Sequence, residues 1–168
     1  EISENLEKLL DRNRAGAGNI KIVFNVRNGG MRHFLAYFVG HRYPSQEDYI
    51  RGVKVLTFAF ERPDPNKKLW RPAFRSEVAE AIRNGNAFEA LLLDSRGTLP
   101  EASKANLFAI KDGRVITPPD ELILPGITRK YILNLCRETG IPVLMQRINL
   151  VDLPGMDAVF LSGTSLHV

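Results

Sequence analysis

Two short segments of the chain combine glycine with groups that bind anions. In residues 124–129 (LPGITR), a glycine turn leads directly into an expected helix. A helix N-terminus presents free N–H groups and a partial positive charge, and it therefore binds phosphate readily. In residues 161–165 (LSGTS), hydroxyl and backbone N–H groups follow an apolar stretch. Each segment alone is more often an ordinary capped helix or a plain turn, but the pair can form one site for phosphate or a carboxylate.

A lysine and a glutamate can supply reactive chemistry beside such a site. Lys67 and Lys68 follow residues 62–66, a stiff turn in which two prolines fix φ. A lysine amine near an anion site can form a Schiff base with a carbonyl cofactor. Glu101 precedes an expected strand, and a carboxylate beside a pyridine nitrogen keeps that nitrogen protonated, as pyridoxal phosphate requires. Taken singly, the lysine pair is typical of a solvated surface and the glutamate of a surface loop.

The elements that must position these residues are mostly short strands. Helical spacing predicts a helix over residues 2–13, and alternating apolar residues predict a hairpin from residues 20–26 and 34–39. Asn28-Gly29-Gly30 forms its turn, and residues 43–46 (YPSQ) are interpreted as a linker. The remaining pattern predicts helices at 72–83 and 128–139, and strands at 52–60, 87–93, 106–110, 114–117, 142–145 and 158–161. Because strands outnumber helices, the fold class is α+β or mixed α/β.

Composition narrows the functional class. The 168 residues carry a net charge of +4, but the basic residues are scattered, which argues against a nucleic-acid partner. No apolar run approaches the roughly 18 residues of a membrane helix, and no signal-peptide pattern is present. Cys136 is the only cysteine, which excludes an intrachain disulfide and favours a cytoplasmic protein. His33, His41 and His167 lack the spacing of metal ligands, so no metal is expected.

Five runs of residues occur in a fixed order along the chain. They are 88–92 (FEALL), 101–108 (EASKANLF), 117–119 (TPP), 124–129 (LPGITR) and 160–165 (FLSGTS). Their order and spacing closely resemble the class IV pyridoxal-phosphate aminotransferases, the family of the branched-chain and D-amino-acid aminotransferases, to which aminodeoxychorismate lyase is related. The resemblance covers most of residues 62–168 and, more loosely, residues 1–61.

The resemblance implies a role for each matched residue. Lys68 matches the lysine that binds pyridoxal 5'-phosphate as a Schiff base, with Lys67 as the alternative, and Glu101 matches the glutamate that pairs with the pyridine nitrogen. Leu124 matches the residue that packs on the ring. The phosphate is expected to bind Gly126, Ile127, Thr128, Gly163 and Thr164, and the substrate carboxylate Thr164 and Ser165. Many family members place a tyrosine after the lysine, at the cofactor's phenolic oxygen, but residues 69–74 contain none.

The resemblance also implies an architecture and an activity. A partial small N-terminal domain, residues 1–45, would precede a partial cofactor-binding domain with a barrel-like sheet, residues 46–168. We expect a longer, cytoplasmic and homodimeric parent protein, truncated here at both ends. Through an internal aldimine on Lys68 it would move an amino group between an amino acid, branched-chain or D-, and a 2-keto acid. The fragment lacks the family's phosphate-binding arginine and is not expected to turn substrate over by itself.

Two alternatives to the transaminase remain open from the sequence. One is a lyase of the same fold, which cleaves aminodeoxychorismate to 4-aminobenzoate and pyruvate. Amino transfer to a keto acid without release of pyruvate would separate the transaminase from this lyase. The other is a degenerate, non-catalytic homologue, which the absence of a yellow chromophore in the full-length protein would support.

Overall fold

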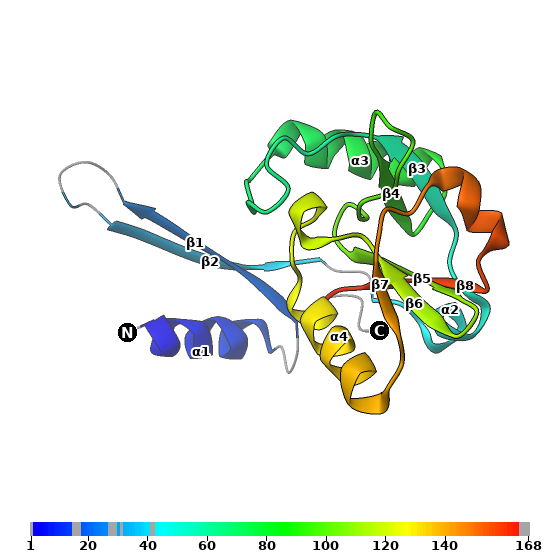
Figure 1. Ribbon diagram of the computed structural model, residues 1–168. Helices are drawn as coiled ribbons and strands as arrows, with labels where there is room; N and C mark the ends of the chain where they lie inside the picture. Colours follow the sequence, from blue (N-terminus) through cyan, green and yellow to red (C-terminus); the bar gives the residue numbers. More distant parts are fainter. Residues whose placement is uncertain (1, 15–17, 27–29, 31, 41–42, 165–168) are drawn as a thin grey trace. The chain divides into compact units, whose positions relative to one another are not determined.

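The computed structural model describes residues 2–14, 18–26, 30, 32–40 and 43–164. The chain forms two compact units, Glu1–Tyr43 and Pro44–Val168, whose elements are shown in Figure 1. The division falls within the residues interpreted as a linker from the sequence. Among the described residues, no helix has both the length and the apolar character required to cross a membrane.

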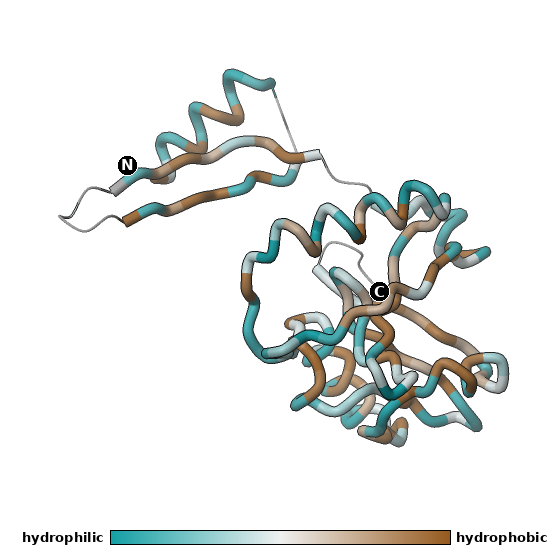
Figure 2. Tube along the Cα trace, turned by 90° about the horizontal axis from the view of Figure 1, so that it is seen from above, coloured by the Kyte–Doolittle hydropathy of each residue, from teal (hydrophilic) through white to brown (hydrophobic). Residues whose placement is uncertain are grey.

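The smaller unit consists of one helix and one β-hairpin. Helix α1 (Ile2–Asn13) and strands β1 (Asn19–Val26) and β2 (Arg32–Val39) lie where the spacing predicts them. The strands pair antiparallel, with Asn19 opposite Val39 at one end and Val26 opposite Arg32 at the other. Figure 2 shows polar and apolar segments following one another along both strands. The predicted helix and hairpin are therefore confirmed, whereas the turn residues 28 and 29 lie outside the described residues.

The larger unit begins with a short helix that the sequence did not predict. Helix α2 (Gln46–Arg51) starts directly after Ser45. The Ser45 hydroxyl accepts the Asp48 N–H at 3.2 Å, and the Asp48 carboxylate accepts the Ser45 N–H at 2.8 Å. This reciprocal capping box satisfies two backbone donors at the start of the helix. The interpretation of residues 43–46 as a linker is therefore wrong at its last residue.

A parallel strand pair and its connecting helix follow. Strands β3 (Val55–Ala59) and β4 (Glu89–Leu93) pair in parallel, and both begin later than the apolar pattern predicts. Helix α3 (Pro72–Asn84) connects them and starts at a proline, whose missing N–H would be unpaired in any first turn. Phe74 and Val78 pack against Ala90 and Leu92, so the apolar stripe of α3 covers β4. Burying a side chain of the size of valine or phenylalanine stabilises the fold by about 1.5–3 kcal/mol.

A four-stranded sheet forms the rest of the larger unit, in the order β7-β6-β5-β8. Its members are β5 (Asn106–Lys111), β6 (Arg114–Thr117), β7 (Val143–Met145) and β8 (Ala158–Ser162). Helix α4 (Ile127–Thr139) packs on one face, where Ile132 and Cys136 meet Phe108 and Val115. Two short 3₁₀-helices, η1 (Asp120–Leu122) and η2 (Leu150–Gly155), lie in the connections.

Two isolated bridges connect the strand pair to this sheet. Leu91 of β4 pairs with Ala102, and Glu101 pairs with Asn106 at the start of β5. The two sheets therefore continue into each other through residues 101–102, and the apolar side chains of both meet in one core. Its buried members are Leu91, Leu99, Ala102, Ala105, Leu107, Ala109, Ile116 and Ile148. The fold class is mixed α/β, as the sequence predicts, and Glu101 lies at the junction of the two sheets.

Candidate active site

Glu101 is held inside the larger unit by two donors. Its side chain is only 5% exposed, and its Oε1 accepts the Nε–H of Arg62 at 2.7 Å. Its Oε2 accepts the backbone N–H of Leu124 at 3.1 Å. Burial raises the pKa of Glu101, while the charge of Arg62 and the hydrogen bonds from Leu124 and Arg62 oppose that rise without cancelling it. The surface-loop interpretation of this glutamate is thus wrong, because the carboxylate is buried and fixed.

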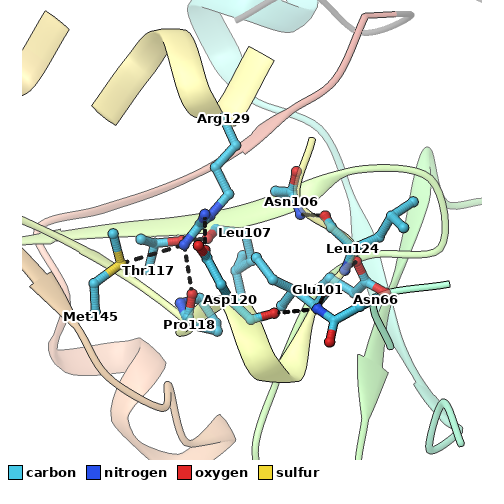
Figure 3. A network of polar contacts seen from close by, with 11 residues as sticks. Asn66, Glu101, Asn106, Leu107, Thr117, Pro118, Asp120, Leu124, Arg129 and Met145 are labelled. Carbon is cyan, nitrogen blue, oxygen red and sulfur yellow. Dashed lines mark hydrogen bonds and ion pairs between the residues drawn. The ribbon is translucent and has the colours of Figure 1, made fainter. Parts of the chain in front are cut away.

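The backbone around Leu124 is fixed by two asparagines (Figure 3). Asn106 Nδ2 donates to the Leu124 carbonyl at 2.8 Å. Asn66 Nδ2 donates to the carbonyls of Asp120, at 2.6 Å, and Ile123, at 2.9 Å. The N–H of Leu124 donates to Glu101 and its carbonyl accepts from Asn106, so both polar backbone groups of Leu124 are paired with side chains from other segments. Such pairing makes the position of Leu124 precise.

Helix α4 begins immediately after this fixed segment. Gly126 is its N-cap and supplies no side-chain hydrogen bond to the first turn. A Cβ on Gly126 would lie well under 3.0 Å from Asn106 Oδ1, so only glycine fits here without movement. Thr128 is half-buried and Ile127 is 67% exposed. The helix N-terminus keeps its backbone donors and positive dipole without a capping side chain, which leaves it suited to an anion.

The end of β8 lies next to the same asparagine. Ser162 is opposite Asn106 in the sheet register. It is 1% exposed, and its Oγ is buried with no hydrogen-bond partner among the described residues. Gly163 passes close to the backbone of Lys104, where a Cβ would lie 3.4 Å from the carbonyl oxygen. Thr164 is exposed, and Ser165 lies outside the described residues. Asn106 therefore joins both segments that the sequence predicts to bind an anion.

The two lysines lie on the loop that Asn66 fixes, and both are exposed. Lys67 Nζ is 3.3 Å from Asp64 Oδ1, an ordinary surface ion pair. Lys68 forms no hydrogen bond or ion pair with any residue in the part of the chain that the structure describes. The structure thus distinguishes the two amines, since among the described residues only that of Lys67 has an ionic partner. No polar contact within the described part links Lys68 to Glu101.

Four residues of this region were given no role from the sequence: Arg62, Asn66, Asn106 and Arg129. Arg129 is 2% exposed, and its guanidinium donates to the Pro118 carbonyl at 2.9 Å and to the Asp120 carboxylate. A signal for it was present, because a cation in the first turn of a helix opposes the macrodipole and needs a specific partner. For the other three, the sequence offers no such signal.

The residues present fit pyridoxal phosphate. Glu101 offers a buried acceptor for a ring N–H, and the uncapped N-terminus of α4 offers donors to a phosphate. The Ser162 hydroxyl is one of two buried side-chain groups without a hydrogen-bond partner among the described residues, the other being Arg71 Nε, and a bound ligand would satisfy it. No group of three His, Cys, Asp or Glu side chains within the described ranges is arranged to bind a metal.

Comparison with known proteins points to one family. The model of the family described as amino-transferase class IV matches residues 1–168. The branched-chain-amino-acid aminotransferase of Escherichia coli (strain K12) is 42% identical over 142 residues, which cover 80% of this chain and 46% of that protein. The chain spans less than half the length of the curated relatives it matches first.

Three of the solved structures that share the fold are compared with this chain. A candidate 4-amino-4-deoxychorismate lyase from Legionella pneumophila superposes with a TM-score of 0.72 over 98% of this chain and 64% of that one, at 20% identity. The branched-chain amino acid aminotransferase from Escherichia coli has a TM-score of 0.72 and 27% identity over 99% of this chain and 62% of the other. A further branched-chain amino acid aminotransferase, complexed with N-(5'-phosphopyridoxyl)-L-glutamate, has a TM-score of 0.61 at 27% identity, over 70% of this chain and 41% of that one.

Proposed function

The chain belongs to the class IV aminotransferase family, and from this membership we propose that its parent protein is a pyridoxal-phosphate-dependent transaminase. It would move an amino group between an amino acid and a 2-keto acid. The observation that carries the proposal is the buried carboxylate of Glu101, fixed by hydrogen bonds at the segment that leads into the uncapped helix α4. In this proposal, the Glu101 carboxylate is the acceptor for a pyridine N–H, and the first turn of α4 supplies the donors for a phosphate.

The chain's own residues divide the work of binding between them. Glu101 would accept the ring N–H, and Leu124 would pack on the ring face. The first turn of α4, Gly126 to Thr128, would donate backbone N–H groups to the phosphate, joined by Gly163 and Thr164 from the end of β8. Thr164 and Ser165 would bind the substrate carboxylate. When bound, pyridoxal phosphate supplies an electron sink that stabilises negative charge at the substrate α-carbon.

Lys68 is the residue we assign to covalent attachment and proton transfer. Its amine is the nucleophile that would bind the aldehyde of the cofactor as a Schiff base. Once displaced by the substrate amine, it would act as a general base and remove the proton from the substrate α-carbon. Lys67 is less suited, because its amine pairs with Asp64, although an exposed pair of this kind is weak.

A branched-chain amino acid is the substrate that we favour, because the relatives of this chain are named as branched-chain enzymes. The lyase reaction is the alternative function, because the chain shares its fold with a protein described as a possible aminodeoxychorismate lyase. Leucine and 2-oxoglutarate should give glutamate with the longer protein, whereas a lyase would release pyruvate from aminodeoxychorismate. The residues that sort D- from L-substrates are not assigned.

The parent protein is further proposed to be a cytoplasmic homodimer. We interpret residues 1–45 as part of its small N-terminal domain and residues 46–168 as part of its cofactor-binding domain. Amino acids and keto acids would be its substrates, and neither a nucleic acid nor a membrane is proposed as a partner. Support comes from the family and from the two units of the chain.

A covalent trap tests the cofactor site in this chain directly. The chain is incubated with pyridoxal phosphate, reduced with borohydride and digested, and the modified peptide is identified by mass. Label is expected to concentrate on Lys68, and Lys68→Ala should remove it while Lys67→Ala retains it. Label spread over many lysines, or confined to Lys67, would contradict the assignment. Repeating the trap on the longer gene product separates a wrong lysine from a site that needs more of the chain.

A further inference from the structure

Arg62 precedes Lys68 on the same loop and contacts Glu101 in the interior. Its Nε donates to Glu101 Oε1 at 2.7 Å, and the two side chains are 14% and 5% exposed. The guanidinium carbon lies 5.9 Å from the centroid of the Phe74 ring. Phe74 belongs to α3 and stacks on Phe60 with a centroid distance of 4.0 Å. The guanidinium is therefore placed between a fixed aromatic ring and a fixed carboxylate.

The carboxylate of Glu101 still has capacity for a further donor. One oxygen accepts from Arg62 and the other from the Leu124 N–H at 3.1 Å, whereas an ionised carboxylate offers about four acceptor positions. The ionised form accepts strongly on both oxygens, whereas a protonated carboxyl uses one of them as a donor and is a weaker acceptor. Burial alone favours that protonated form, and the adjacent guanidinium is the principal charge that opposes it.

We infer that Arg62 is a positioning residue for the cofactor's pyridine nitrogen: it orients the Glu101 carboxylate and keeps it ionised, so that Glu101 can accept the ring N–H. The inference rests on the proposed function, since it requires pyridoxal phosphate at this site. Arg62 acts only through Glu101. The loop that carries Lys68 is bound to the rest of the site by two of its side chains. Arg62 donates to Glu101, and Asn66 donates to the Ile123 carbonyl, next to Leu124.

Loss of Arg62 has a defined consequence for the ring. A buried Glu101 without its cation takes up a proton or turns away, and either change weakens or removes the acceptor that the ring N–H needs. Lysine at this position keeps the charge but not the planar, directed Nε–H. Arg62→Lys should therefore restore part of what Arg62→Gln loses, whereas a purely space-filling role would make the two variants equal.

The first measurement requires no cofactor. The chain is labelled with ¹³C at the glutamate carboxyl, and the signal of Glu101 is assigned by its loss in Glu101→Gln. A pH titration should give a higher pKa for Glu101 in Arg62→Gln than in the wild type, with Arg62→Lys between them. Arg75→Gln is the matched control, because Arg75 lies over Trp70, with its guanidinium carbon 4.8 Å from the ring centroid, and does not contact Glu101. It should leave the titration unchanged.

The second measurement follows the ring nitrogen itself. With ¹⁵N-labelled pyridoxal phosphate, the wild type and Arg75→Gln should show the chemical shift of a protonated pyridine nitrogen. Arg62→Gln should move the shift towards the unprotonated value and weaken binding about tenfold or more, as expected for a lost hydrogen bond to a charged group. Arg62→Lys keeps the test decisive if Arg62→Gln does not fold.

The outcomes separate this inference from the function on which it rests. A protonated nitrogen in the wild type and unchanged in both Arg62 variants would overturn the role of Arg62 and leave the transaminase proposal standing. An unchanged Glu101 titration would do the same. If the wild-type chain and the longer protein both fail to bind pyridoxal phosphate, the proposed function fails, and the positioning role fails with it.

Discussion

Replacing Gly126 with alanine tests whether the start of α4 is as tightly packed as the structure shows. The backbone at Gly126 has φ −78° and ψ 149°, a conformation open to any residue, so alanine meets no backbone strain. Its Cβ, however, would lie well under 3.0 Å from Asn106 Oδ1. Either the asparagine or the first turn of the helix must therefore move.

The expected cost follows from what that movement breaks. Asn106 Nδ2 donates to the Leu124 carbonyl at 2.8 Å, and losing such a bond costs about 0.5–1.5 kcal/mol. Inserting a methyl group into a filled site adds about 1–3 kcal/mol. We expect Gly126→Ala to lower the free energy of unfolding by about 2–4 kcal/mol, which corresponds to a decrease in Tm of roughly 4–16 °C for a domain of this size.

Urea and thermal unfolding followed by circular dichroism, with Trp70 fluorescence as a second probe, measure this change. Gly155→Ala is the matched control, because a Cβ there meets nothing within 4 Å. In an Asn106→Ala background the clashing oxygen is gone, so the added Gly126→Ala change should cost under about 1 kcal/mol, a direct sign of coupling. If Gly126→Ala is as stable as Gly155→Ala, the result would contradict the close packing of the Asn106 side chain against Gly126.

Three further predictions concern Lys68, Glu101 and Arg129. In the longer protein, Lys68→Ala should abolish keto-acid formation while Lys67→Ala retains most of it; the opposite result would make Lys67 the reactive lysine. Because burial raises the pKa of Glu101 above its ordinary 4.5, the folded state binds this proton more tightly than the unfolded state. Stability should therefore fall as pH rises from 4.5 through the folded-state pKa, and urea titrations of Glu101→Gln should lack that decrease; equal slopes would refute the burial argument. Arg129→Ala should lower the free energy of unfolding by about 2–4 kcal/mol, because hydrogen bonds from a buried charge are lost, and it should shift the urea midpoint at constant m. A change below about 0.5 kcal/mol would show that the Arg129 contacts do not stabilise the fold.

Local signals predicted structure where the deciding interactions lie within a few residues. Asp-Gly between two apolar runs is a strong hairpin signal, and Asp112 and Gly113, which connect the paired strands β5 and β6, both have the positive φ that it requires, 49° and 70°. Pro72 begins α3 for a similarly local reason. Ser45 shows the limit of such signals. Its capping box uses Asp48 at the position where Glu or Gln is usual, and the preceding proline favoured a linker instead.

The environment of Glu101 could not be predicted in this way. Its partners Arg62 and Leu124 lie 39 and 23 residues away, and periodicity does not indicate which of 23 basic residues approaches a given carboxylate. From the residues alone, a surface loop was the commoner interpretation of Glu101. The ordered motifs of the family, rather than local physics, singled it out, and the fold shows why its carboxylate is buried.

The turn before α4 must keep its backbone donors in one position, and side chains outside that turn achieve this from both ends. On one side, the Arg129 guanidinium donates to the side-chain carboxylate of Asp120, and the Asn66 amide donates to the backbone carbonyl of the same residue. On the other, Glu101 and Asn106 bind the N–H and the carbonyl of Leu124. Figure 3 shows these two sets of contacts flanking the same short segment. The turn, Leu124 to Gly126, has no polar side chain that could fix its backbone from within, so its precision must come from these partners. Substitutions at the partners should therefore disturb anion binding even though none of them needs to contact the anion.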